Sequence, residues 1–334
     1  MSLKAAELCA GYGGLAKAIE EVFDAKTVWV SEFEDAPSKI LAHHWPDARN
    51  LGDMTKINWY GVEPVDIMSG GSPCQDLSLA GKRRGMQDGT RSNLWESMRE
   101  GIAIIKPRYV VWENVRGSLS AEATSISDMG HREGFLDQRG GHLRALGRVL
   151  GDLADLGFDA EWRGLRAADV GAPHGRFRVF ILAANRDYLG IDRAGKRAEQ
   201  NRRGQPAHRR IATADTNHSG SQGQHHQAGT SPAQRHRHAS QGVDWRQYTG
   251  AVRRWEALHR AAPSPVEMSP TGKPRLSAPF AEWMMGLPEG WVTDVPGVGW
   301  GDQLKACGNG VVPAQAAAAL RDMLAAFNNQ EAAV

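Results

Sequence analysis

The sequence has 334 residues, with 40 Lys and Arg against 38 Asp and Glu, which gives a net charge of +2. At 41% hydrophobic and 23% charged residues it has the composition of an ordinary globular protein. No apolar run approaches the ~18 residues of a membrane-spanning helix, and the N-terminus lacks a long apolar signal-peptide core. We therefore expect a cytoplasmic protein with no membrane partner. Three widely spaced cysteines argue against a disulfide framework.

The near-neutral total conceals an uneven distribution of charge. Residues 186–274 contain 15 Lys and Arg against 7 Asp and Glu, so the rest of the chain is acidic on balance. Within this basic stretch, residues 201–242 are rich in Gly, Ser, Gln, His and Arg. Because almost nothing there can be buried, we expect a long flexible segment.

Apolar periodicity predicts strands alternating with helices on both sides of a largely parallel sheet. The expected elements are, in chain order, a strand at 3–9, a turn at 11–14, a helix at 15–23, a strand at 27–31, a helix to about 44, a strand at 65–68, a helix at 94–105, a strand at 109–112, a helix at 143–156 and a strand at 178–183. Ligands bind such sheets at the carboxyl ends of the strands. We therefore expect Gly11, Glu32, residues 73–75 and Glu113 to converge.

A glycine turn follows the first expected strand. Residues 11–16 (GYGGLA) satisfy the pattern G-x-G-x-x-A, and Glu32 ends the next expected strand. Such a turn allows close backbone approach, and a carboxylate at the strand end can accept both ribose hydroxyls. A nicotinamide dinucleotide, S-adenosylmethionine and a tight turn without a ligand all fit this motif. Asp53 could accept from an adenine amino group or could be a surface turn residue.

Two further strand ends carry reactive residue types. Cys74 lies in a polar turn, where backbone amides or positive charge could stabilise a thiolate, although an inert thiol is the alternative. Glu113 directly follows an apolar strand, so burial could raise the pKa of its carboxyl and suit it to proton donation. The alternative for Glu113 is a helix cap or a salt bridge.

Paired arginines open the last expected strand of the first half. Strand alternation places Arg176 and Arg178 on one face and Phe177 on the other. Two guanidinium groups on one face could hold a carbonyl oxygen or phosphates, and a solvated edge is the alternative.

The order of these motifs resembles the DNA (cytosine-5)-methyltransferases along nearly the whole chain except residues 188–274. The matching stretches are GYGG (11–14), GGSPCQDLSLAGKRRG (70–85), RSNLW (91–95), ENV (113–115), GAPHGRFRVFIL (171–182), PRLSAPFAEWMMGLP (274–288) and GNGVVP (308–313). Pro-Cys-Gln followed by Glu-Asn-Val at this spacing is highly specific for the family.

The resemblance implies that Cys74 attacks carbon 6 of cytosine and so turns carbon 5 into a nucleophile. Glu113 would contact the ring at nitrogen 3 and the amino group, and Arg176 would hold the base carbonyl oxygen with support from Arg178. Asn114 would orient the turn that carries Cys74. The implied catalytic group is Cys74, Gln75, Glu113, Asn114, Arg176 and Arg178.

The implied cofactor is S-adenosylmethionine, with S-adenosylhomocysteine as its product and no metal ion required. Two positions depart from the family pattern, because Cys9 replaces an aromatic residue and His174 replaces a glutamine. Loss of the aromatic removes a stacking surface against adenine. The implied cofactor residues are Gly11, Tyr12, Gly13, Gly14, Glu32, Phe33, Asp53, Met54, Leu94, Asn309 and Val311.

The fold implied is a Rossmann-like α/β methyltransferase domain with a mostly parallel sheet, formed by residues 1–187 and 275–334. Residues 188–274 would be a small, irregular target-recognition region. We expect Trp245, Tyr248 and Trp255 to form a small local core there, and stacking on bases is the alternative.

The resemblance makes duplex DNA the expected partner, with the target nucleotide flipped out of the stack. Lys82, Arg83 and Arg84 could contact phosphates or be solvated, and Arg253 and Arg254 could read guanines or contact phosphates. A monomer, a cognate restriction endonuclease and association with the nucleoid of a prokaryotic or phage-infected cell are further expectations. A tRNA cytosine-5 methyltransferase and a DNA-binding protein that has lost catalysis remain alternatives.

Overall fold

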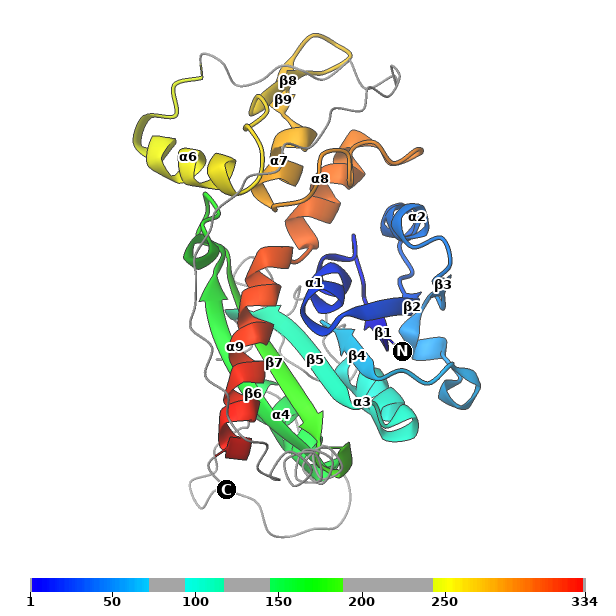
Figure 1. The fold of residues 1–334 in the computed structure, drawn as a ribbon. Helices are drawn as coiled ribbons and strands as arrows, with labels where there is room; N and C mark the ends of the chain where they lie inside the picture. The colour runs from blue at the N-terminus through cyan, green and yellow to red at the C-terminus, as the bar shows by residue number, and fades with distance from the viewer. Residues whose placement is uncertain (1, 72–93, 117–144, 189–242, 333–334) are drawn as a thin grey trace, which may run out of the picture.

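One seven-stranded sheet organises the part of the chain that the computed structural model describes, namely residues 2–71, 94–116, 145–188 and 243–332. Its strand order is β3-β2-β1-β4-β5-β7-β6 (Figure 1). The strands are β1 (Leu3–Leu8), β2 (Ala25–Ser31), β3 (Arg49–Asn50), β4 (Ile67–Gly70), β5 (Tyr109–Val115), β6 (Phe158–Arg166) and β7 (Phe177–Asn185). The neighbouring strands from β3 to β5 pair in parallel, whereas β7 runs antiparallel to both β5 and β6. The predicted largely parallel sheet is therefore confirmed, and the reversal of β7 is an addition to it.

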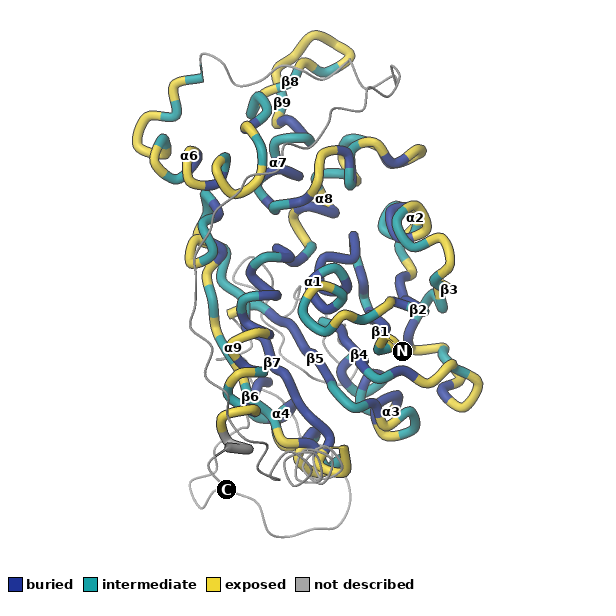
Figure 2. The backbone as a smooth tube through the Cα atoms, in the orientation of Figure 1, coloured by how far each residue is buried: buried dark blue, intermediate teal, exposed yellow. Residues whose placement is uncertain are grey.

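Helices cover both faces of this sheet. The described helices are α1 (Gly14–Phe23), α2 (Asp35–His44), α3 (Leu94–Ile105), α4 (Ala145–Asp155), α6 (Thr249–Leu258), α7 (Ala278–Met284), α8 (Trp300–Asn309) and α9 (Pro313–Ala332). Leu15, Ala18 and Ile19 recur at helical spacing on α1 and pack with α9 against one face of the sheet. Trp95 and Met98 of α3 pack with α4 against the opposite face. The sheet is accordingly the most buried layer of the molecule (Figure 2).

A third cluster lies beyond one end of the sheet, where α6, α7, α8 and the hairpin of β8 (Val266–Met268) and β9 (Pro274–Leu276) gather (Figure 1). Trp255 is fully buried there, and its indole N–H donates to the Trp283 carbonyl at 2.8 Å. Trp245 stacks on Phe280 with ring centroids 5.6 Å apart. Trp255 lies in a core against which Trp245 is partly buried, but this core includes residues beyond 275 and is therefore not the local one predicted. The prediction is wrong for Tyr248, which is 59% exposed.

Within the described ranges, no helix combines the length and the apolar character needed to cross a membrane. The expected flexible segment at 201–242 lies outside these ranges, as do Cys74, Gln75, Lys82, Arg83 and Arg84.

Candidate active site

The glycine turn joins β1 to α1 at the point where the strand order reverses between β1 and β4. Gly11 and Gly13 have φ angles of 57° and 78°, a region that residues with a Cβ atom rarely adopt. The backbone N–H of Gly11 donates to Glu32 Oε2 at 2.9 Å. This hydrogen bond ties the turn to the end of β2, so the predicted convergence of Gly11 and Glu32 is confirmed.

Glu32 is held by its own surroundings. Its backbone N–H donates to Asn50 Oδ1 at 3.0 Å, and its Oε1 accepts from the N–H of Glu34 at 2.9 Å. The carboxylate is 8% exposed, whereas the ring of the next residue, Phe33, is 65% exposed. Because each carboxylate oxygen can accept two hydrogen bonds, Glu32 keeps capacity for further donors.

Tyr12 packs underneath the turn. Its side chain is fully buried, and its hydroxyl donates to the carbonyl of Val311 in the C-terminal segment. A Cβ atom on Gly310 would lie 1.9 Å from the Tyr12 ring, and one on Gly14 would lie 2.3 Å from the Val311 carbonyl oxygen. The Gly-Asn-Gly stretch and the glycine turn therefore fit together only because Gly14 and Gly310 lack side chains.

A small cavity lies beside the glycine turn. Cys9, Met54 and Leu94, which the family resemblance singles out, line it together. The Cys9 thiol contacts Met54 Sδ at 3.5 Å, and burial raises the pKa of this thiol to about 12. The lining residues are Leu8, Cys9, Met54, Gly71, Leu94, Trp95, Met98 and Trp112.

Asp53 caps the short helical turn at Met54–Lys56. Its Oδ1 accepts from the backbone N–H of Thr55 at 3.0 Å and from the Thr55 hydroxyl at 2.8 Å. These hydrogen bonds lower the pKa of Asp53. The surface-turn interpretation of Asp53 therefore matches the contacts seen.

Glu113 and Arg178 form a buried ion pair on two adjacent strands. Antiparallel pairing places Arg178 opposite Val115, so Glu113 is its diagonal neighbour on the same face of the sheet. Arg178 Nε lies 2.7 Å from Glu113 Oε1, and both side chains are nearly buried. Burial raises the pKa of Glu113, against the opposing effect of the charges on Arg178 and Arg176.

Gly71 lies against this pair. A Cβ atom on Gly71 would approach Glu113 Oε2 to 2.9 Å and the Glu113 backbone oxygen to 2.8 Å. Cys74 lies outside the described residues, but it is three residues further along the chain.

The segment before β7 reaches two other elements. His174 Nε2 donates to the carbonyl of Met284 at 3.0 Å, and burial lowers the pKa of this imidazole. The Arg176 guanidinium donates to the carbonyls of Gly308 and Gly310 at 2.8 and 2.7 Å. The sequence predicts that Arg176 holds the base with Arg178 in support, whereas the structure places Arg178 beside Glu113.

Asn114 is fully buried in β5, and its Oδ1 accepts from the N–H of Val115 at 2.8 Å. The turn that Asn114 is predicted to orient lies outside the described residues. Arg253 and Arg254 are exposed on α6, a position that suits either of the contacts considered for them.

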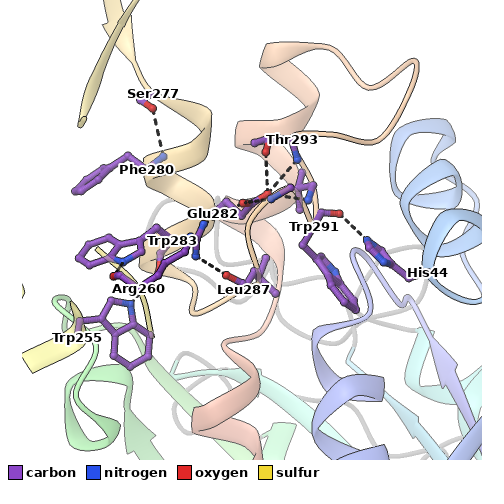
Figure 3. Close-up of polar contacts among 12 residues, drawn as sticks. His44, Trp255, Arg260, Ser277, Phe280, Glu282, Trp283, Leu287, Trp291 and Thr293 are labelled. Atoms are coloured by element: carbon purple, nitrogen blue, oxygen red, sulfur yellow. Dashed lines mark hydrogen bonds and ion pairs between the residues drawn. The ribbon is translucent and has the colours of Figure 1, made fainter. Parts of the chain in front are cut away.

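Two structurally important residues are missed by sequence reasoning. Trp291 donates its indole N–H to the Tyr12 carbonyl at 3.0 Å, and its ring stacks on His44 at a centroid distance of 3.6 Å. His44 Nε2 also donates to the Trp291 carbonyl at 2.7 Å (Figure 3). Glu7 is buried within β1, where its Oε2 accepts from the N–H of Ala16 at 2.8 Å, and burial raises the pKa of its carboxyl. The only local signal for Glu7 is an acidic residue between apolar neighbours in the second half of a strand.

Among the described residues, no group of three or more His, Cys, Asp or Glu side chains could hold a metal ion.

The glycine turn at the strand switch point, the acid that ends β2 and the reversed β7 together define an α/β methyltransferase fold.

Comparison with known proteins identifies the family. The family model for C-5 cytosine-specific DNA methylases matches residues 3–325, and the chain belongs to that family. Type II methyltransferase M.NlaIV of Neisseria lactamica is 32% identical over 187 residues, which are 54% of this chain and 41% of that protein. The chain spans about two-fifths of the length of the first curated relatives it matches.

Two solved structures share the fold at 15% sequence identity. A DNA modification methyltransferase encoded in an Escherichia coli prophage aligns with a TM-score of 0.53, covering 97% of this chain and 99% of its own. A DNMT2 variant from Spodoptera frugiperda aligns with a TM-score of 0.52, covering 97% of this chain and 100% of its own.

Proposed function

We propose that this protein transfers a methyl group from S-adenosylmethionine to carbon 5 of cytosine in a specific duplex DNA sequence. The observation that carries the proposal is the buried pair of Glu113 and Arg178, which lies against Gly71 only three residues before Cys74. Membership of the C-5 cytosine-specific DNA methylase family supports this assignment.

The residues around the glycine turn fit the cofactor. Glu32 offers a buried, fixed carboxylate to the ribose hydroxyls, and the Phe33 ring beside it is exposed enough to stack on adenine. Met54 and Leu94 line the apolar side, while Asn309 and Val311 approach from the C-terminal segment. When bound, S-adenosylmethionine supplies an electrophilic methyl group on a sulfonium centre.

The protein's own groups then handle the base. The Cys74 thiolate forms a bond to carbon 6. The electrons of the carbon 5–carbon 6 double bond shift to form a double bond between carbons 4 and 5, and Glu113 protonates nitrogen 3. Carbon 5 takes the methyl group as the methyl–sulfur bond breaks and leaves S-adenosylhomocysteine, and the proton on nitrogen 3 returns to Glu113. Carbon 5 then loses its own proton to a base. Expulsion of the Cys74 thiolate restores the double bond and releases 5-methylcytosine.

Glu113 is suited to this role by its environment. Burial favours its protonated form, which can donate to nitrogen 3, and the adjacent Arg178 stabilises the carboxylate left after donation. We therefore propose that Glu113 and Arg178 both face the flipped cytosine, and that Arg178 binds the carbonyl oxygen of the cytosine ring.

The basic stretch at 186–274 supports a polyanionic partner, because cations that replace counterions along a duplex favour binding. We propose that Lys82, Arg83, Arg84, Arg253 and Arg254 contact DNA. The nucleotide must leave the stack to reach Glu113, because carbon 6 is inaccessible in the duplex. We further propose that the protein acts as a monomer on DNA in the cytoplasm, with a cognate restriction endonuclease.

Transfer of tritium from methyl-labelled S-adenosylmethionine tests the proposal directly. Label should enter duplex DNA, and bisulfite sequencing of a methylated plasmid should place it at cytosines in one sequence context. Label in tRNA but not in DNA would instead establish an RNA methyltransferase. DNA binding without any transfer would establish a protein that has lost catalysis.

Replacing Arg178 by Gln should move the pH profile of methyl transfer. If protonated Glu113 is required, activity falls as pH rises through the pKa of Glu113. Loss of the neighbouring positive charge raises this pKa further, so the falling limb should move to higher pH. Loss of a preorganised donor should also reduce the single-turnover rate by about 10²-fold.

Arg163→Gln is the matched control for Arg178→Gln. Arg163 lies on β6, which β7 separates from the β5 strand of Glu113, and it pairs with Glu161 and Asp322. Single-turnover rates measured across pH should therefore show an unmoved limb for this control. An unmoved limb in Arg178→Gln as well would mean that the charge of Arg178 does not set the titration.

A further inference from the structure

Arg176 grips the end of a helix rather than the Glu113 carboxylate. Its Nη1 donates to the Gly308 carbonyl at 2.8 Å, and its Nη2 donates to the carbonyls of Gly310 and Asn309 at 2.7 and 3.3 Å. These carbonyls belong to the last residues of α8 and to the residue that follows it. One guanidinium thus serves three successive backbone oxygens.

These hydrogen bonds satisfy carbonyl groups at the C-terminal end of α8. The last carbonyls of an α-helix lack partners within the helix and carry the negative end of its dipole. α8 ends at Asn309, and Gly310, which follows it, has a φ of −71°, so the helix lacks the left-handed glycine that often satisfies such carbonyls. The planar, charged fork of Arg176 supplies the missing donors.

The backbone of Arg176 is fixed as well. Its carbonyl accepts from the N–H of Ala167 at 2.7 Å and from Gln315 Nε2 at 3.1 Å. Gln315 lies in the first turn of α9 and is fully buried. Arg176 is therefore joined to the C-terminal segment twice, through its side chain at the Gly-Asn-Gly stretch and through its carbonyl at Gln315.

The stretch that Arg176 holds, residues 308–310, and the following residue, Val311, pack directly against the glycine turn. Tyr12 donates to the Val311 carbonyl, and Gly14 and Gly310 leave no room for a Cβ atom at this junction. A shift of residues 308–311 would therefore displace the turn that approaches the cofactor.

We propose that Arg176 is a positioning residue for the cofactor, which clamps residues 308–311 against the glycine turn, whereas Arg178 serves the base. The two arginines of one motif thus support two different ligands. This inference rests on the proposed function, because it assigns the glycine turn to S-adenosylmethionine.

Binding of S-adenosylhomocysteine without DNA, measured by isothermal titration calorimetry, separates the two roles. Arg176→Gln should weaken binding by about 10-fold or more, since it removes charge-assisted hydrogen bonds. Arg176→Lys keeps the charge but loses the fork, so its affinity should fall between those of Arg176→Gln and the wild type. Arg178→Gln should bind within about 2-fold of the wild type, although its methyl transfer is about 10²-fold slower.

Gly310→Ala disturbs the same junction without changing charge and gives a second route to the result if Arg176→Gln fails to fold. Its S-adenosylhomocysteine affinity should fall as well, because the new methyl group would meet the Tyr12 ring. Wild-type affinity in either Arg176 variant, combined with lost methyl transfer, would overturn the inference and place Arg176 on the base. A wild-type protein that fails to bind S-adenosylhomocysteine would instead overturn the proposed function.

Discussion

Replacing Cys74 by Ser is expected to lower the rate of methyl transfer by a factor on the order of 10⁴ or more, as removal of a catalytic nucleophile does in other enzymes. A serine hydroxyl is not ionised near neutral pH, so it cannot make the attack on carbon 6 that a thiolate makes. Transfer of tritiated methyl groups into duplex DNA measures the loss. DNA containing 5-fluorocytosine should also trap the wild type covalently and leave the variant free.

Cys307→Ala provides the matched cysteine control. Cys307 is buried in α8, where burial raises the pKa of its thiol to about 12, so it is protonated at neutral pH and cannot act as a nucleophile. This variant should retain both transfer and trapping. The assignment of Cys74 fails if Cys74→Ser still forms the covalent complex.

Replacing Glu282 by Ala is expected to cause the largest loss of stability, about 3–5 kcal/mol. Glu282 is fully buried, and its carboxylate accepts from the N–H groups of Gly290, Val292 and Thr293 at 2.8–3.0 Å (Figure 3). It also faces Arg260 Nη2 at 3.2 Å. Truncation would leave these donors without an acceptor and the arginine without its counter-charge. Urea unfolding should show the loss.

Glu267→Ala is the matched control, because Glu267 also pairs with an arginine, Arg275, but at a partly exposed position on the β8–β9 hairpin, where its side chain is 28% exposed. An ion pair at the surface contributes little, so this variant should lose less than about 1 kcal/mol. Equal losses in the two variants would show that burial of Glu282 is not what makes it important.

Loss of the Glu282 carboxylate should also disturb the position of the glycine turn. The carboxylate holds the backbone on both sides of Trp291, and Trp291 donates to the Tyr12 carbonyl. The chain between Gly290 and Thr293 therefore connects the buried acid to the glycine turn.

Most of the sheet could be predicted because burial on one or both faces leaves a local pattern. The runs at β1, β4 and β5 are apolar because both faces of a central parallel strand are covered. The sequence pattern does not predict β6. This strand lies at the edge of the sheet, and its charged residues Asp159, Glu161 and Arg163, which are typical of protected edges, interrupt the apolar pattern expected of a strand.

The candidate site likewise contains residues that the sequence predicts and contacts that it does not. The sequence predicts Gly11, Glu32 and Glu113 as site residues because each follows or ends a recognisable strand. Tyr12 was assigned to the cofactor along with its neighbours, yet its side chain is buried against Gly310, almost three hundred residues away. Nothing local to residue 12 reports that contact.

By itself, the sequence determined the alternation of strands and helices, the strand ends that carry reactive groups and the family to which their order belongs. These features are local, since they depend on periodicity and on residue type at a turn. Only the tertiary structure decided that β7 runs antiparallel to β5, which makes Arg178 a diagonal neighbour of Glu113. It also decided that Arg176 holds the carbonyls of Gly308–Gly310. The physical reason is that two arginines on one strand face look alike in sequence, and the partners that distinguish them come from distant parts of the chain.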